Sequence, residues 1–250
     1  MLAFITGASS GIGKATAEVF ANHGIDLVVC GRRIERLDAL AKILSTKVKV
    51  HVLNFDVRSN KSVTEAIGSL PSEFKKIDIL INNAGNAIGL SPIHEGNIDD
   101  WDYMMDANVK GLLYVSKAVI PGMVARKHGH IVNIGSIAGK EVYINGNVYC
   151  ASKHAVDALT KGMRLDLYKH GIKVTSVNPG MVETEFSVVR FKGDTQRAEK
   201  VYEGITPLSA QDIADSILFT VTRPAHVQIA DLTILAAAQG AATEVNRNQK

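Results

Sequence analysis

Short apolar runs alternate with longer amphipathic segments along the whole chain. The apolar runs are rich in Val, Ile and Leu, which is typical of parallel strands that are covered on both faces. They predict strands at residues 2–6, 26–30, 49–55, 77–82, 129–134, 173–177 and 228–234. Helical periodicity between these runs predicts helices at residues 12–22, 33–44, 61–70, 98–123, 148–170 and 211–221.

The regular alternation of strand and helix predicts an α/β fold. Connections of this kind are right-handed crossovers, so we expect a Rossmann-like, doubly wound parallel sheet of about seven strands flanked by helices. Ser209 and Asp212 have the spacing of a capping box at the start of the last predicted helix. No linker-like or low-complexity segment interrupts residues 1–250, which predicts a single domain.

Composition and charge narrow the classes of function. The chain has 28 Lys and Arg residues against 25 Asp and Glu, and its basic residues form only short clusters. A nucleic-acid-binding protein concentrates positive charge along one face, so this pattern argues against one. Cys30 and Cys150 lie far apart and outside any metal-ligand spacing, so we expect no metal site and thiols kept in a reducing compartment. No signal-peptide core or membrane-length apolar run is found, which favours a cytoplasmic protein without a membrane partner.

Glycines follow the first predicted strand. Residues 6–13 are TGASSGIG, with Gly7, Gly11 and Gly13 at the point where the first predicted helix begins. Glycine lets the backbone turn tightly and approach a pyrophosphate, and the free N–H groups of a new helix face the phosphates. Strand-to-helix turns also use glycine for structural reasons alone, but the place of this cluster in the chain predicts a dinucleotide site.

Two arginines follow the second predicted strand. An NAD enzyme places Asp or Glu at this point, about twenty residues past the glycines, to bind the ribose 2′-hydroxyl. This chain has Arg32 and Arg33 instead. A guanidinium suits a 2′-phosphate, whose charge an acidic side chain would repel. The pair therefore predicts NADP(H), unless both arginines only begin a solvated helix and pair with Glu35 or Asp38.

The spacing of the three glycines resembles that of the short-chain dehydrogenase/reductase family, and the resemblance continues over essentially the full chain. It implies that Asp56 contacts the adenine, that the run from Asn83 to Gly85 lies against the cofactor, and that Thr184 binds the carboxamide. The complete implied set of cofactor-binding residues is Gly7, Ser9, Ser10, Gly11, Ile12, Gly13, Arg32, Arg33, Asp56, Val57, Asn83, Ala84, Gly85, Tyr149, Lys153, Pro179, Gly180, Val182 and Thr184.

Tyr149 and Lys153 stand four residues apart in a predicted helix, which places them on one face. A free tyrosine has a pKa of about 10, which is too high for a base at neutral pH. A neighbouring ammonium favours the phenolate, so we expect Lys153 to lower the pKa of Tyr149. This spacing is common on helix surfaces, so it indicates a catalytic pair only together with further residues.

Four residues act together in the family that this chain resembles, and the chain has them in the same order: Asn108, Ser136, Tyr149 and Lys153. The resemblance implies that Tyr149 exchanges a proton with the substrate oxygen, which Ser136 holds. It also implies that Lys153 holds the nicotinamide ribose and that Asn108 positions a water molecule. The implied reaction is hydride transfer between NADP(H) and a small alcohol or carbonyl compound.

The segment after the sixth predicted strand narrows the resemblance. Residues 179–194, PGMVETEFSVVRFKGD, are similar to the NADP-dependent 3-hydroxy acid dehydrogenases, which oxidise serine, allo-threonine and other 3-hydroxy acids or reduce malonic semialdehyde. We expect a substrate lid near residues 183–208. A carboxylate substrate needs a cation. Arg190 is the first candidate for it, beside Ser136 and Tyr149 as substrate-binding residues, and Lys192 and Lys140 are the alternatives.

Two other functions are open at this point. A 3-oxoacyl-thioester reductase, acting on ACP or CoA substrates, shares every catalytic residue, although the lid segment argues against the open pocket it needs. A catalytically inactive binding module would have lost Tyr149 or Lys153, and neither is lost. The resemblance also implies a homotetramer built through the long helices at 98–123 and 148–170, and the tail at 236–250 is expected to fray or to pack on a neighbouring subunit.

Overall fold

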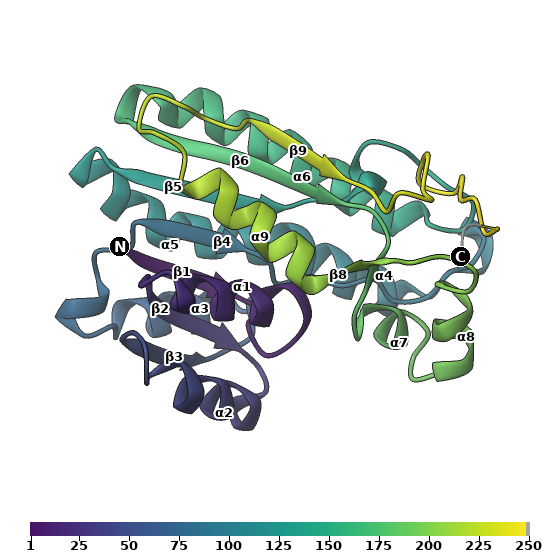
Figure 1. Ribbon diagram of the computed structural model, residues 1–250, viewed down its shortest axis with the longest axis horizontal. Coiled ribbons are helices and arrows are strands. Elements are labelled where there is room, and N and C mark those ends of the chain that lie inside the picture. The colour runs from purple at the N-terminus through teal and green to yellow at the C-terminus, as the bar shows by residue number, and fades with distance from the viewer. Residues whose placement is uncertain (249–250) are drawn as a thin grey trace.

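A seven-stranded sheet forms the centre of the computed structural model, which describes residues 1–248 (Figure 1). All its strands are parallel, in the order β3-β2-β1-β4-β5-β6-β9. Its strands are β1 (Leu2–Thr6), β2 (Asp26–Gly31), β3 (Val50–Asn54), β4 (Ile79–Asn82), β5 (Gly129–Ile134), β6 (Ile172–Pro179) and β9 (Asp231–Ile234). The expected doubly wound α/β fold is confirmed.

Helices cover both faces of this sheet. One layer contains α1 (Gly11–Asn22), α2 (Ile34–Leu44) and α9 (Ala210–Val221), and the other contains α3 (Asn60–Gly68), α5 (Gly111–Arg126) and α6 (Asn147–Leu167). The remaining helices are α4 (Ile98–Met105), α7 (Phe186–Arg190), α8 (Thr195–Lys200), the 3-10 turns η1 (Ser72–Phe74), η2 (Ile93–Glu95), η4 (Ile137–Gly139) and η5 (Tyr168–His170), and the π-helix η3 (Asp106–Lys110). A separate parallel pair joins β7 (Val182–Glu183) to β8 (Leu208–Ser209).

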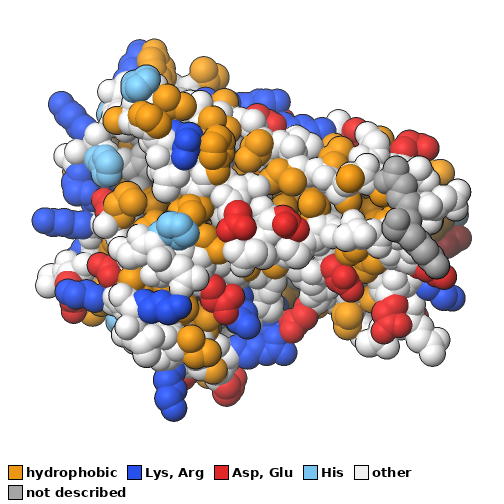
Figure 2. All heavy atoms as spheres, in the orientation of Figure 1, with side chains coloured by type: hydrophobic (Ala, Val, Ile, Leu, Met, Phe, Trp, Pro, Cys, Tyr) orange, Lys and Arg blue, Asp and Glu red, His pale blue; other side chains and the backbone are white. Residues whose placement is uncertain are grey.

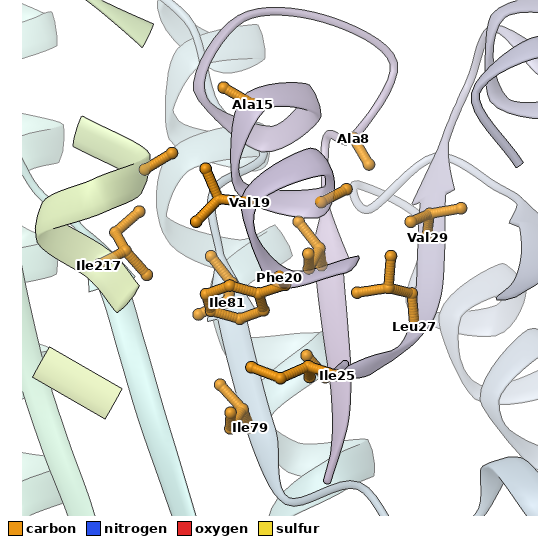
Figure 3. Close-up of a cluster of buried hydrophobic side chains, with 14 of the residues drawn as sticks. Ala8, Ala15, Val19, Phe20, Ile25, Leu27, Val29, Ile79, Ile81 and Ile217 are labelled. Carbon is orange, nitrogen blue, oxygen red and sulfur yellow. The ribbon is translucent and has the colours of Figure 1, made fainter. Parts of the chain in front are cut away.

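The two layers follow from the alternation of side chains along each strand. In β1, Ala3 and Ile5 face the layer of α1, whereas Leu2 and Phe4 face the layer of α5. Figure 3 shows the first of these clusters, in which Phe20 of α1 packs between the sheet and α9. Burying an aromatic or branched side chain of this size stabilises the fold by about 1.5–3 kcal/mol each, so both layers hold the sheet in place.

The predicted helix at 98–123 is divided in the structure. It consists of α4, one π-turn at η3, and α5, because the N–H of Gly111 bonds to the carbonyl of Asp106, five residues back. Such wide turns inside helices are often found at functional sites. The predicted capping box is confirmed, since Ser209 and Asp212 exchange hydrogen bonds at the start of α9. The expected lid contains two helices, α7 and α8, that its sequence did not predict.

Acidic and basic side chains are mixed on the face shown in Figure 2. Lys and Arg are most numerous at the left-hand end, and Asp and Glu lie among them and across the rest of the face, so no continuous basic stripe crosses it. Within residues 1–248, no helix is long and apolar enough to cross a membrane. The same described residues contain no group of three His, Cys, Asp or Glu side chains that could hold a metal ion. Cys30 and Cys150 are both buried as free thiols.

Candidate active site

A pocket of about 650 Å³ opens at the carboxyl ends of the central strands. Parallel α/β sheets bind ligands at this edge, where the strand order reverses. Here that reversal lies between β1 and β4, whose connections leave toward opposite sides of the sheet. Every expected cofactor-binding residue lines this pocket except Gly13, which lies directly behind it.

The glycine loop has the backbone that its sequence predicted. Gly7 and Gly11 have φ angles of +68° and +53°, which residues other than glycine rarely adopt. A Cβ atom on Gly13 would lie 2.4 Å from the carbonyl oxygen of Gly7, so only glycine lets α1 start this close to β1. Ser10, the N-cap of α1, makes no side-chain capping bond, which leaves the first N–H groups of the helix available to a phosphate.

Arg33 lies across the mouth of this loop. Its Nε and Nη2 atoms donate to the hydroxyl of Ser9 at 3.1 and 3.0 Å, and Nη2 also donates to Ser10 at 2.6 Å. Arg32 points to the other side, where it donates to the phenol of Tyr103 on α4. The guanidinium of Arg33 and the hydroxyls of Ser9 and Ser10 therefore lie together, and Arg32 lines the same pocket. Guanidinium and hydroxyl groups are donors that suit a phosphate group.

The other strand ends brace the pocket floor. The side chain of Asn83 donates to the carbonyl of Thr6 at 2.9 Å, and the hydroxyl of Thr6 accepts from the N–H groups of Asn83 and Ala84, so the ends of β1 and β4 are fixed together. Asp56 accepts from the guanidinium of Arg58 at 2.7 Å. Burial alone would raise the pKa of Asp56, but the bonds from Arg58 outweigh it and hold that pKa below its usual value.

Ser136, Tyr149 and Lys153 meet at the inner end of the pocket. All three side chains are buried and line it, Ser136 from the turn after β5 and the other two from α6. The Nζ atom of Lys153 donates to the carbonyl of Ile134 at 2.9 Å and lies 6.0 Å from the centre of the Tyr149 ring. The structure thus brings together three of the four candidate catalytic residues.

The protonation of this group differs from the sequence expectation. Burial raises the pKa of Tyr149 far above its ordinary value, and the neighbouring Tyr143 adds to this, whereas Ser136 and Arg190 act in the opposite direction. Burial also lowers the pKa of Lys153, to about 8. The ammonium of Lys153 bonds to the carbonyl of Ile134 at the end of β5 rather than to the phenol of Tyr149. In the chain without cofactor the phenol of Tyr149 is therefore a weaker acid than a free tyrosine.

Asn108 lies behind the pocket rather than in its lining. The π-turn of η3 directs its side chain at the loop after β4, where its Oδ1 accepts from the N–H of Asn86 at 2.8 Å and its Nδ2 donates to the carbonyl of the same residue at 2.8 Å. Nδ2 also donates to Ser152 at 2.9 Å, and the Ser152 hydroxyl donates to the carbonyl of Tyr149 at 2.7 Å. Asn108 thus connects the pocket loop with the helix that carries Tyr149.

Of the three candidate cations for a carboxylate, only Arg190 lines the pocket. Its Nη2 donates to the hydroxyl of Tyr143 at 2.5 Å, and its guanidinium carbon lies 5.3 Å from the centre of the Tyr149 ring. Its Nε is buried and has no hydrogen-bond partner among the described residues. Lys140 is instead paired with two aspartates on α6 and β9, and Lys192 with Asp100.

Several pocket residues were not predicted. Tyr143 precedes α6, and Phe186 packs on Tyr149 with ring centres 5.6 Å apart. Tyr202 donates from its phenol to the carbonyl of Val182 at 2.9 Å. An aromatic side chain at 143, 186 or 202 has no spacing that relates it to Tyr149, so only the folded chain brings these residues together.

The end of the chain also lines this pocket. Gln239 is buried, and its Oε1 accepts from the N–H of Met181 at 3.0 Å. The N–H of Ala242 donates to Glu141 at 2.8 Å, and Gln239 pairs with Val245 in an antiparallel bridge. Residues 236–248 therefore fold back over the pocket, unlike the expected fraying tail, and residues 249–250 of that tail lie outside the described residues.

The chain belongs to the short-chain dehydrogenase family, whose model matches residues 1–194. It is 45% identical over 230 residues, 92% of each chain, to an NADP-dependent 3-hydroxy acid dehydrogenase of Salmonella typhi. It is 44% identical over 94% of its length to sulfoacetaldehyde reductase 2 of Chromohalobacter salexigens, 93% of which is covered. Among solved structures, the closed form of serine dehydrogenase complexed with NADP+ has a TM-score of 0.93 at 43% identity, with 97% of each chain covered.

Proposed function

We propose that this protein is an NADP(H)-dependent dehydrogenase of small 3-hydroxy acids. The observation that carries the proposal is one pocket that holds a buried Tyr149 and Ser136 at one point and the unshared donor of Arg190 beside them. A 3-hydroxy acid has its hydroxyl and its carboxylate two carbons apart, so both groups fit one small site. Relatives with this activity, at 45% identity over nearly the whole chain, support the same substrate class.

The cofactor fits the residues at the outer end of the pocket. The glycine loop offers its turn and the N–H groups of α1 to the pyrophosphate, and Arg32 and Arg33 with Ser9 and Ser10 offer donors to a 2′-phosphate. Asp56 and Val57, which line the same pocket, would contact the adenine, and Pro179, Gly180, Val182 and Thr184 would hold the nicotinamide. When bound, NADP(H) supplies or accepts the hydride.

Tyr149 moves the proton. In oxidation its phenolate oxygen takes the proton of the substrate hydroxyl and becomes the phenol, and in reduction the phenol gives its proton to the carbonyl oxygen, which Ser136 holds in place. Because burial raises the pKa of this phenol, it needs positive charge close by to act as a base. Lys153 supplies that charge while it is protonated, below about pH 8, and holds the nicotinamide ribose. Asn108 keeps α6 and the loop after β4 in register for these steps.

Arg190 binds the carboxylate in this proposal. Its bond to Tyr143 fixes one side of the guanidinium, and the buried Nε remains to donate to an anion. A buried donor without a partner costs about 1–3 kcal/mol, which a bound carboxylate recovers. The same geometry favours a second candidate activity, the reduction of sulfoacetaldehyde. Its sulfonate is attached to the carbon next to the reacting one, as the carboxylate is in malonic semialdehyde.

We propose further that the protein is a cytoplasmic homotetramer. Large apolar side chains are exposed on the long helices that the family uses for assembly, with Leu165 at 73% and Tyr168 at 60% exposed near the end of α6. Exposed apolar groups of this size mark contact surfaces. Two buried free thiols are consistent with a reducing compartment.

Steady-state assays test the substrate class and the cofactor. The purified protein is supplied with NADP+ or NAD+ and with serine, allo-threonine, 3-hydroxybutyrate or 2-hydroxyethanesulfonate. We expect turnover of at least one 3-hydroxy acid, with kcat/KM at least tenfold higher for NADP+ than for NAD+. Oxidation of the sulfonate alone would select the second candidate. Inactivity with all four compounds, together with reduction of 3-oxoacyl thioesters by NADPH, would replace the proposal by the thioester reductase.

A further inference from the structure

The lid helix α7 is held by ion pairs at both of its ends. It has only five residues, yet it carries Phe186 and Arg190, which contact Tyr149 and Tyr143 in the pocket. Glu185 precedes the helix and Lys192 follows it. A helix this short is not stable by itself, so what holds its ends decides where its side chains lie.

Glu185 pairs with two arginines of the nucleotide half. Its Oε2 lies 2.7 Å from Nη1 of Arg33, and its Oε1 lies 2.5 Å from Nη1 of Arg36 on α2, 149 positions away in sequence. Hydrogen bonds from Arg33 and Arg36 hold the pKa of Glu185 below its ordinary value. The carboxylate is therefore charged at neutral pH and joins α7 to α2.

Arg33 belongs to two sites at once. Its Nε and Nη2 atoms donate to Ser9 and Ser10 in the glycine loop, and its Nη1 atom donates to Glu185 at the start of the lid. The guanidinium that is expected at the 2′-phosphate is thus bonded to the lid. Arg36 differs, because it pairs with Glu185 but does not line the pocket.

The far end of α7 is fixed to a different part of the chain. Nζ of Lys192 lies 2.8 Å from the carboxylate of Asp100 on α4, and the N–H of Gly89 donates to the carbonyl of Arg190 at 2.9 Å. These contacts involve the loop after β4 and α4, not the glycine loop. The two ends of α7 are therefore bonded to two different parts of the pocket.

We propose that Glu185 is a positioning residue that fastens the substrate lid to the cofactor site through Arg33 and Arg36. An Arg33 held by the cofactor would then keep the start of α7 against the nucleotide site, which places Arg190 for the substrate anion and covers the nicotinamide end of the pocket. This inference rests on the proposed NADP(H) function but not on the choice of hydroxy acid. Opening of the lid, which the cofactor needs in order to leave, requires the two ion pairs of Glu185 to break.

Release of NADPH tests the inference without any substrate. Stopped-flow fluorescence measures the dissociation rate of NADPH from the wild type and from Glu185→Gln, Arg36→Gln and the double variant. Glu183→Gln is the matched control, because Glu183 is exposed on β7 and forms no ion pair within residues 1–248. Half-exposed ion pairs contribute modestly, so we expect release to be about two- to fivefold faster in each single variant. The double variant should be no faster than Glu185→Gln alone, and the control should match the wild type.

The salt dependence of NADPH release and the hydrogen exchange of α7 distinguish the loss of the Glu185 ion pairs from a general loss of structure. At high ionic strength the wild type should approach the rate of Glu185→Gln, since screening weakens exposed ion pairs. In the NADPH complex, amides 186–190 should exchange faster in the variant, while those of α6 keep their protection. Unchanged release in Glu185→Gln, or additive effects of the two substitutions, would overturn the inference. A wild type that binds no NADPH at all would instead refute the proposed function.

Discussion

Tyr149 and Lys153 are both buried, and burial moves their pKa values in opposite directions. It raises that of the phenol and lowers that of the ammonium, because in each case the charged form loses its hydration. A phenolate at Tyr149 is therefore unfavourable unless positive charge lies close to it. Both of these buried groups lie on α6, one helical turn apart.

Removing the phenol hydroxyl should stop the reaction but not cofactor binding. Tyr149→Phe keeps the ring that packs on Phe186 and removes the hydroxyl that we propose exchanges the proton. We expect kcat to fall by about 10²–10⁴-fold, the usual contribution of acid–base catalysis, with NADPH affinity within about threefold of the wild type. Steady-state kinetics and fluorescence titration measure both. Tyr143→Phe is the control, because it should raise KM through Arg190 and leave most of kcat; substantial turnover by Tyr149→Phe would remove its assignment.

Lys153 should cost the folded chain stability at neutral pH. Its folded pKa of about 8 lies below the ordinary 10.5, so the folded state binds the proton less well than the unfolded state does. The penalty is full below pH 8 and disappears as the pH rises through 10.5. We expect Lys153→Met to be more stable by about 1–3 kcal/mol at pH 7, with the gain shrinking towards pH 10. Urea unfolding without cofactor measures it. The exposed Lys161→Met should show no such gain, and a pH-independent effect at 153 would contradict the argument.

At the scale of elements, sequence patterns predicted those features that depend only on neighbouring residues. The glycine turn, the tyrosine–lysine pair on one helix face and the capping box of α9 each depend on residues a few positions apart. Strand 228–234 was predicted too long, since Gln228 bonds to the sheet through its side chain and Ile229 accepts a threonine hydroxyl, so regular pairing begins only at Asp231.

Contacts between distant elements could not be predicted in this way. Arg33 and Glu185 are 152 positions apart, and no periodicity relates them. The same holds for the aromatic side chains of Phe186 and Tyr202 in the pocket of Tyr149. It also holds for Gln239, which bonds to the loop after β6. The sequence therefore predicted the candidate catalytic groups, whereas the residues that surround them in the pocket could be found only in the structure.

The junction of β2 and α2 should decide which cofactor is used. Arg32→Ala with Arg33→Ala removes both guanidinium groups around the expected phosphate position. Charge-assisted bonds are worth about 1.5–3 kcal/mol each, so we expect NADP+ affinity to fall about 100-fold or more. Affinity for NAD+ should change by less than about threefold. Calorimetric titration with both nucleotides compares them, and equal losses would show that the arginines are only surface charges.

At the scale of the whole molecule, the exposed apolar groups on α6 predict assembly. Leu165→Glu places a charge in the proposed contact and should convert the proposed tetramer into smaller species. Size-exclusion chromatography with light scattering measures the mass in solution. Ile43→Glu is the control, because Ile43 is 60% exposed on α2, in the other helical layer. A wild-type monomer, or an intact tetramer of Leu165→Glu, would contradict the proposed interface.

The wide turn at η3 has a consequence for how this chain tolerates changes in length. One residue more than a regular helix requires is accommodated between α4 and α5, so the flanking helices keep their phase. Deleting a residue from 106–110 should close this bulge into ordinary α-helix and leave the packing of α5 intact. The amide of Asn108 would then no longer reach the loop after β4. We expect a shortened chain that folds, with normal circular dichroism and thermal melting, yet has lost its turnover.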